Sequence, residues 1–181
     1  DTWQNYQKAF TSASAGNTES ILEFNYAIPY PSHNFNRKFS PRADGGASNV
    51  GDGAASPTQE MVECYEYAGG GIVDWTPWHT AIGTTTPPPY DQLEPRFHAT
   101  VLYNGAPWKG RTVESFQGGV DGWIEFNSSE APTGRSVTGY FLRKLIDESH
   151  LEFSSSTPST QPSIIIRLAE VYLNHAEACY R

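Results

Sequence analysis

Large aromatic residues stand close together in a stretch that has neither helical nor strand periodicity. Trp75 and Trp78 follow a run of three glycines, and Tyr90 follows a run of three prolines. Flat aromatic rings beside amides and carboxylates suit a sugar, which offers an apolar C–H face and a rim of hydroxyls. Asp74 and His79 would supply polar partners, so this stretch is a candidate carbohydrate platform.

Two further stretches combine an aromatic residue with polar neighbours. Trp123 lies near Asp121 and Asn127, and Tyr30 precedes two asparagines. The alternative is that tryptophans in a loop-rich chain form its local core, and for any single tryptophan this is the simpler interpretation. The candidate ligand-binding residues are Trp75, Trp78, Trp123, Tyr90, Tyr30, Asn34, Asp74 and His79.

Carboxylates near these aromatics leave a glycoside hydrolase open as an alternative. That chemistry needs two carboxyl groups facing each other at about 5–5.5 Å or 6.5–9.5 Å. No spacing in the sequence is distinctive for such a pair. A Ser/His/Asp triad is not indicated either, because no GxSxG elbow is present. We therefore expect no catalytic residue. The available carboxylates are Asp74, Asp91, Glu94, Asp121 and Glu125.

The Gly-rich run 42–53 could supply oxygen ligands to Ca²⁺ from Asp44, Asn49 and Asp52. It lacks the spacing of a calcium-binding loop, so a turn-forming loop is the preferred interpretation. Cys64 and Cys179 each fall in an expected helix without zinc-type spacing, which predicts two buried thiols. We expect neither a metal nor a cofactor.

The bulk composition limits the classes of partner. A length of 181 residues suits one domain, and a formal net charge of −8 makes nucleic acid and anionic membrane surfaces unlikely partners. No apolar run approaches the roughly 20 residues of a membrane span. Any membrane attachment is expected to lie outside this chain.

The spacing of apolar residues and the positions of glycines, prolines and capping residues predict the elements that would position these residues. Helical spacing over 3–10 and 164–181, the latter with a strongly apolar face, predicts two helices, and β-formers before Pro29 predict a short strand near 21–30. Residues 33–55 are expected to form a long loop. Ser56 is the expected cap of a helix that begins at Pro57 and ends at the glycines. A strand-like 99–103 precedes an Asn-Gly turn, and 139–147 suits a strand or a helix.

Several stretches resemble the SusD/RagB family of outer-membrane nutrient-binding lipoproteins of Bacteroidetes-type bacteria. The matching segments are ESILEFNY (19–26), SPTQEMVECYE (56–66), LEPRFHATVLYNGAPWKG (93–110), TGYFLRKLIDES (138–149) and IIIRLAEVYLNHAEA (164–178). Their order and spacing together are specific, although each alone is weak. Glu94, His98 and His175 depart mildly from the family pattern.

The resemblance implies a mainly α fold: a tetratricopeptide-like helical scaffold that carries a large irregular insertion with a few short strands. On that basis 1–12 end one scaffold helix, 13–162 form the insertion with short helices and strands, and 163–181 begin a C-terminal scaffold helix. Only part of the fold would then be present. Trp108 falls in a family-like segment and is assigned to packing, as is Trp3, which has helical spacing.

The resemblance also implies a function. Family members are non-catalytic, lie at the surface of the outer membrane through a lipid anchor, and bind oligosaccharides or other nutrients. They pass these ligands to a SusC-like TonB-dependent transporter. Their ligand contacts lie on loops that differ between members, so no binding residue is carried over. A peptide nutrient and a pure protein-interaction module of the transporter complex stay open as alternatives beside the glycoside hydrolase.

Overall fold

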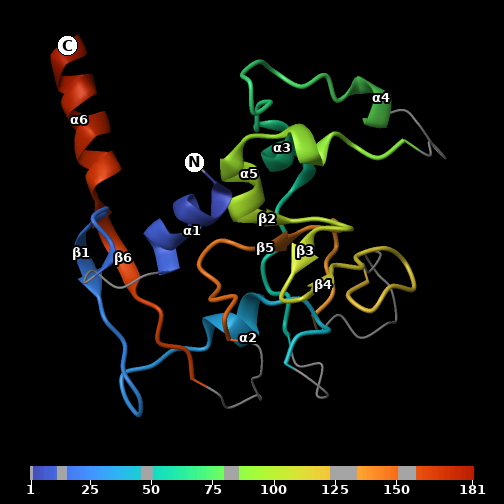
Figure 1. Ribbon diagram of the computed structural model, residues 1–181, viewed down its shortest axis with the longest axis horizontal. Helices are drawn as coiled ribbons and strands as arrows, with labels where there is room; N and C mark the ends of the chain where they lie inside the picture. Colours follow the sequence, from blue (N-terminus) through green and yellow to red (C-terminus); the bar gives the residue numbers. More distant parts are fainter. Residues whose placement is uncertain (1, 12–15, 46–50, 80–85, 123–133, 151–157) are drawn as a thin grey trace.

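The computed structural model describes residues 2–11, 16–45, 51–79, 86–122, 134–150 and 158–181. These form two parts, which we call the body and the arm (Figure 1). The arm consists of strands β1 (Ser20–Phe24) and β6 (Ser163–Arg167) and helix α6 (Leu168–Tyr180). The body contains the other elements: α1 (Trp3–Thr11), α2 (Phe35–Phe39), α3 (Gln59–Glu63), α4 (Thr76–His79), the 3₁₀ turn η3 (Tyr90–Gln92), α5 (Pro95–Thr100), β2 (Val101–Leu102), β3 (Pro107–Trp108), β4 (Arg111–Thr112) and β5 (Phe141–Leu142).

The core of the body forms where α5 runs directly into β2. Pro95 occupies the first turn of α5, where its fixed φ and missing N–H cost nothing, and Phe97 is completely buried on the inner face. Two-residue strands then pair antiparallel, with Val101 opposite Leu142 and Leu102 opposite Phe141. Each of these apolar side chains stabilises the fold by about 1.5–3 kcal/mol through burial.

This region corrects one sequence prediction and refines two others. The expected strand over 99–103 is a helix as far as Thr100, and only Val101 and Leu102 are extended. The Asn-Gly turn is confirmed: Gly105 has φ +87° and its N–H donates to the carbonyl of Val113 at 2.8 Å. The segment 139–147, expected as strand or helix, contributes the strand β5.

Helix α3 is present but its cap differs from the prediction. The hydroxyl of Thr58, rather than that of Ser56, accepts the N–H of Met61 at 3.3 Å, and the helix has five residues. The Ser56 hydroxyl instead bonds Ser136 at 3.1 Å. Cys64 caps the C-terminus before the glycines are reached, and both Cys64 and Cys179 are exposed, so the prediction of buried thiols is wrong.

Residues 33–55, expected as a loop, include the short helix α2. Its buried Asn36 explains why an irregular stretch is ordered here. The Asn36 side-chain oxygen accepts from the backbone N–H of Asp147 at 3.2 Å and from the amide of Gln161 at 3.0 Å. One polar side chain thereby ties α2 to two segments more than 100 residues away.

The predicted N-terminal helix is confirmed as α1, and cationic side chains hold it against the body. The Arg143 guanidinium lies 3.8 Å from the ring centroid of Trp3, and the Lys144 ammonium lies 4.1 Å from that of Phe10. Arg143 is itself fixed by two hydrogen bonds to Glu148, at 2.7 and 2.9 Å. Trp3 therefore packs, as expected.

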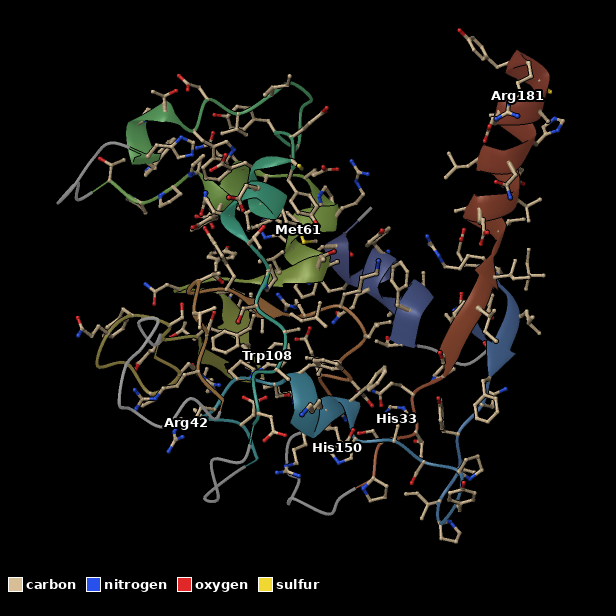
Figure 2. The ribbon with its side chains drawn as sticks, turned by 180° about the vertical axis from the view of Figure 1, so that it is seen from behind. His33, Arg42, Met61, Trp108, His150 and Arg181 are labelled. Atoms are coloured by element: carbon tan, nitrogen blue, oxygen red, sulfur yellow. The ribbon has the colours of Figure 1, made fainter. Side chains whose placement is uncertain are left out.

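In the arm, the predicted strand near 21–30 is confirmed as β1, which ends at Phe24. The predicted C-terminal helix begins at Leu168, four residues later than expected, because Ile164, Ile165 and Ile166 are β-branched and extend as β6, antiparallel to β1. No residue of α6 is buried by the described residues. Figure 2 shows Arg181 at the outer end of the arm and Trp108 inside the body. Among the described residues no helix is long and apolar enough to cross a membrane.

Candidate functional site

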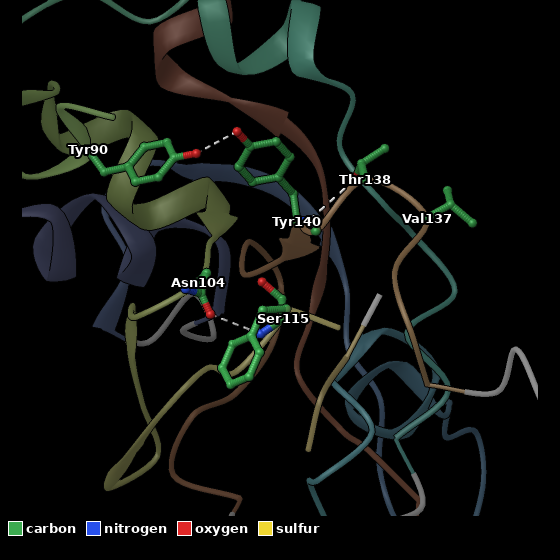
Figure 3. A pocket seen from close by; sticks show the side chains of 8 residues that line it. Tyr90, Asn104, Ser115, Val137, Thr138 and Tyr140 are labelled. Carbon is green, nitrogen blue, oxygen red and sulfur yellow. Dashed lines mark hydrogen bonds between the residues drawn. The ribbon is translucent and has the colours of Figure 1, made fainter. Parts of the chain in front are cut away.

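An open cleft of about 400 Å³ lies on the body where four segments meet (Figure 3). The segments are η3, the turn after β2, the stretch that follows β4, and the approach to β5. Several short pieces distant in sequence therefore build one concave surface. The lining residues are Tyr90, Asn104, Ser115, Phe116, Val137, Thr138, Gly139 and Tyr140.

One side of the cleft is a pair of hydrogen-bonded tyrosines. The hydroxyls of Tyr90 and Tyr140 lie 2.7 Å apart and face each other in Figure 3. The Tyr90 ring is held by Tyr103, with centroids 4.4 Å apart, and is stacked on Phe97 at 5.7 Å. Burial, followed by the neighbouring Tyr140, raises the pKa of Tyr90, so this phenol is neutral at any physiological pH.

The floor of the cleft contains a buried hydroxyl that lacks a partner. Ser115 is 3% exposed, and its Oγ makes no hydrogen bond with any described residue. Its backbone N–H donates to the side-chain oxygen of Asn104 at 3.2 Å, which fixes the direction of that amide. Figure 3 shows the Ser115 hydroxyl pointing into the space between Asn104 and the tyrosine pair.

The opposite side of the cleft is glycine, and the rim is apolar. Gly139 has φ +81°, and a Cβ built on it would lie 3.8 Å from the Ser115 carbonyl oxygen and 4.0 Å from Oγ. Glycine therefore permits the backbone turn and places no side chain beside the hydroxyl. Phe116 is 50% exposed and Val137 59% exposed, so each offers an apolar surface beside that hydroxyl.

A chain of hydrogen bonds connects the cleft to the candidate residues on α4. The Tyr140 hydroxyl donates to the Gln59 side-chain oxygen at 2.8 Å, and the Gln59 amide donates to Glu63 at 2.9 Å. The same carboxylate oxygen lies 2.5 Å from Nε2 of His79. Hydrogen bonds from His79 and then Gln59 lower the pKa of Glu63, which keeps this group ionised.

The tryptophans that prompted the platform hypothesis have unequal exposure. Trp75 is 5% exposed and belongs to the core cluster, as the packing alternative expects. Trp78 is half-buried against it, with ring centroids 5.9 Å apart, and its indole N–H donates to the Thr86 carbonyl at 3.1 Å. Only Trp78 has part of its ring at the surface, so the pair does not form two parallel platforms.

The polar residues next to these tryptophans stabilise α4. The Asp74 side chain accepts the Thr76 N–H at 3.0 Å, and the hydrogen bond to Thr76 lowers the pKa of Asp74. His79 pairs with Glu63 of α3, as described above. Trp78 and His79 thus lie on α4 and Asp74 directly before it, and Glu63 and Gln59 connect α4 to the cleft.

The other candidate residues are separate from the cleft. Tyr30 is 86% exposed in a turn closed by a 2.7 Å hydrogen bond from the Ala27 N–H to the Pro31 carbonyl. The chain that follows β1 lies at the opposite end of the molecule from α4 (Figure 1). Asn34 precedes α2, is exposed, and makes no side-chain capping bond. Trp123 lies outside the described residues.

Among the described candidates, Tyr90 is the residue that lines the cleft. Sequence reasoning missed Asn104, Ser115, Phe116 and Tyr140, since none lies in a motif with a recognisable chemistry. The Asn-Gly turn at 104–105 was the available signal, because a turn between two strands places an amide at the surface.

The described carboxylates considered for hydrolysis have structural partners, and Glu125 lies outside the described residues. Asp91 accepts from the Tyr103 hydroxyl at 3.4 Å, and Glu94 pairs with Arg96 at 2.5 Å. Asp121 is fully buried and takes two hydrogen bonds from Arg111, at 2.6 and 3.0 Å. Over the described residues that line the cleft, no carboxyl group occurs.

In the loop considered for Ca²⁺, Asp44 has a structural role, and Asn49 lies outside the described residues. Asp44 is 4% exposed and is paired with Arg111 at 2.7 Å and with Lys109 at 3.2 Å, while Trp108 donates its indole N–H to it. Its oxygens are therefore occupied by protein donors. Within the described ranges no group of three or more His, Cys, Asp or Glu side chains could hold a metal ion.

Comparison with known proteins assigns the class. Residues 18–181 match the SusD family, and the protein belongs to that family. Members of this family are generally glycan-binding nutrient proteins of the outer-membrane surface and are generally non-catalytic. A comparison with curated proteins finds no match.

Solved structures agree with this assignment. A SusD-like protein from Bacteroides fragilis, BF3747, is similar with a TM-score of 0.68 and 25% identity over 98% of this chain. The selenomethionine structure of BT4246 has the same fold, with a TM-score of 0.64 and 21% identity over 97% of this chain. The chain spans about a third of the length of both, 35% and 33%.

Proposed function

We propose that this chain is the ligand-binding part of a non-catalytic surface protein that captures an oligosaccharide in the cleft beside Tyr90. The observation that carries the proposal is the buried Ser115 hydroxyl, which has no described partner and lies at the floor of an open cleft with an apolar rim. An unpaired buried polar group costs about 1–3 kcal/mol, and a ligand hydroxyl would remove that cost. Family membership supports a glycan as the ligand.

The cleft matches the two-sided chemistry of a sugar ring. Phe116 and Val137 offer apolar surface to the C–H face, while Ser115 and Asn104 offer polar atoms to the hydroxyls. Such an open site with few anchors is expected to bind weakly, with Kd from micromolar to millimolar, or about −8 to −4 kcal/mol. Several sites on one glycan would raise the effective affinity.

The remaining candidate residues are proposed as a second contact surface on α4. Trp78 presents the exposed part of its ring beside Asp74 and His79, and buried Trp75 supports it from behind. A long oligosaccharide could extend from the cleft across α3 to this surface. Tyr30, Asn34 and Trp123 stay predictions, since the first two are not among the residues that line the cleft and Trp123 lies outside the described residues.

The wider role proposed for the protein follows from the family. The captured nutrient would pass to a SusC-like TonB-dependent transporter, and a lipid anchor outside this chain would hold the protein at the cell surface. The division into a scaffold end at 1–12, an insertion at 13–162 and a second scaffold segment at 163–181 is part of this proposal. So is a tetratricopeptide-like scaffold, whose C-terminal helix would start at Leu168.

The direct test is calorimetric titration of the full-length protein with a panel of plant, host and microbial oligosaccharides. Phe116→Ala should weaken binding of the best ligand about tenfold, because it removes a stacking face. Phe24→Ala is the matched control, since Phe24 is 49% exposed but lies on the arm. Trp78→Ala reports whether the α4 surface takes part.

Three results would contradict the proposal. Binding that survives Phe116→Ala unchanged would exclude the cleft as the site. A panel without any bound oligosaccharide, together with tight binding of a peptide, would replace the glycan by a peptide nutrient. Transporter binding without either ligand would favour the pure protein-interaction module.

A further inference from the structure

We propose that the cleft selects neutral sugars against acidic ones, because the hydrogen-bond chain behind it leaves the Tyr90 hydroxyl as an acceptor and because no described lining residue carries a positive charge. The inference rests on the proposed function and deepens it by naming the class of sugar. It depends on the direction of each hydrogen bond between Glu63 and the cleft, which follows from what each group is able to donate.

The hydrogen-bond chain begins at the Glu63 carboxylate, which can only accept. An ionised carboxylate has no proton to donate, so the Gln59 group that faces Glu63 at 2.9 Å must be the amide NH₂. His79, 2.5 Å from the same carboxylate oxygen, donates to it as well. The side-chain oxygen of Gln59 consequently points the other way, toward the Tyr140 hydroxyl at 2.8 Å.

The orientation of Gln59 then fixes which of the two phenols donates in each hydrogen bond. Because the Gln59 oxygen only accepts, Tyr140 must use its single proton on that bond. The 2.7 Å contact between Tyr140 and Tyr90 is then made with the proton of Tyr90. Both phenol protons are used, so a ligand meets the Tyr90 oxygen with lone pairs only.

The other polar groups in the cleft can bind a neutral hydroxyl. The Asn104 oxygen is occupied by the Ser115 N–H at 3.2 Å, which leaves its NH₂ as a donor. The Ser115 hydroxyl can rotate to donate or accept. An acceptor, a donor and a group able to do both suit sugar hydroxyls, each of which donates and accepts.

A carboxylate or sulfate does not suit this arrangement. It cannot donate to Tyr90, and the described lining residues include no Lys, Arg or His that would compensate its desolvation. The formal net charge of the chain, −8, acts in the same direction at longer range. Selectivity from the local polarity should persist in salt, whereas selectivity from net charge should not.

The test compares one oligosaccharide in two charge states. The best neutral ligand of the panel is titrated against the full-length protein, beside the same oligosaccharide with its C6 hydroxyls oxidised to carboxylates. We expect the acidic form to bind at least about tenfold more weakly. The ratio should persist in 1 M NaCl, where the Debye length is about 3 Å.

Two variants test the hydrogen-bond chain itself. Tyr90→Phe removes the acceptor, so binding of the neutral sugar should weaken several-fold and the ratio should fall; Tyr103→Phe, in the same aromatic cluster but outside the cleft, should change neither. Glu63→Lys replaces an acceptor with a donor, which turns the Gln59 amide and reverses the chain. Tyr90 would then donate into the cleft, and the ratio should fall without any change to a lining residue.

Glu66→Lys makes the same change of charge at an exposed residue that is not part of the hydrogen-bond chain, and it is the control for Glu63→Lys. If no oligosaccharide binds, both the proposed function and this inference fail. If a neutral sugar binds but the acidic form binds equally well, only the selectivity is overturned. Equal ratios in Glu63→Lys and Glu66→Lys would overturn the role of the hydrogen-bond chain.

Discussion

The body and the arm use the same kinds of residues in opposite ways. In the body, Phe97, Leu102 and Trp108 are at most 1% exposed and meet residues from several distant segments. In the arm, Tyr172 and Leu173 are 65% and 71% exposed along α6. The contrast shows that an apolar face specifies a helix locally, whereas burial depends on which segments come together.

The two parts also differ in how polar groups are held. The body encloses Asp121 and Asp44 around Arg111, with backbone N–H groups completing the network. The arm has one described ion pair on α6, the exposed Glu177 with Arg181. Among the described residues, the buried polar network that could fix the geometry of a specific binding site therefore lies in the body.

The largest expected effect is the loss of an aromatic side chain from the core of the body. Phe97→Ala should lower the free energy of unfolding by about 3–5 kcal/mol, because the buried ring of α5 contacts Tyr65, Tyr90 and Tyr103. Urea denaturation followed by circular dichroism measures this. A loss below about 1 kcal/mol would show that the body is not the cooperative unit.

The next effect concerns the buried carboxylate of the body. Asp121→Asn should lower the free energy of unfolding by about 2–3 kcal/mol, since it leaves Arg111 without its closest partner and converts an acceptor oxygen into a donor facing backbone N–H groups. Asp91→Asn, at an exposed carboxylate, is the control. Equal losses in the two variants would contradict a special role for the buried network.

A smaller effect is pH-dependent and again separates body from arm. Burial lowers the pKa of His98 below its ordinary value of 6.5, so the unfolded chain takes up a proton more readily than the folded one. The contribution of His98 to stability is therefore present above about pH 6.5 and is lost as the pH falls below it. His98→Gln should flatten this slope in urea titrations at a series of pH values; His175→Gln, on the exposed helix α6, is the matched control.

The smallest effect is expected on α6. Leu173→Ser should change the free energy of unfolding by less than about 0.5 kcal/mol, because the described residues bury no part of this helix. Thermal melting of the chain of 181 residues measures this. A loss above about 1.5 kcal/mol would show that α6 packs on the body. If Leu173→Ser lowers the free energy of unfolding more strongly in the full-length protein, the apolar face of α6 is covered by other residues there.

Local rules in the sequence predicted the elements better than the site. The spacing of Trp3 and Phe10 predicted α1, and the Asn-Gly pair predicted the turn, because both depend on neighbouring residues. The strand β6 was missed because its isoleucines suit helix and strand spacing alike, and pairing with β1 decided between them. The Thr58 cap was missed because Ser56 offers the same chemistry two residues earlier.

The cleft could not be predicted, because its lining comes from segments whose approach is set by long-range packing. Ser115 is one of many serines in the sequence, and only the structure shows that its hydroxyl is buried without a described partner. The burial of Trp75 could not be predicted from the sequence for the same reason. Aromatic composition alone does not tell which ring is covered, and here the rings of Trp78 and Tyr90 pack against Trp75, with centroids 5.9 and 6.4 Å away.

The central claim is that the Ser115 hydroxyl forms a hydrogen bond with a bound ligand, and a pair of serine variants tests this claim most directly. Ser40 is the control: it is equally buried, and its hydroxyl also lacks a described partner, but it lies outside the cleft. Both Ser115→Ala and Ser40→Ala should leave the free energy of unfolding unchanged or raise it, since each removes an unpaired polar group. Calorimetric titration with the best oligosaccharide should show binding weakened about fivefold to tenfold in Ser115→Ala alone. Equal affinity in the two variants would contradict the account.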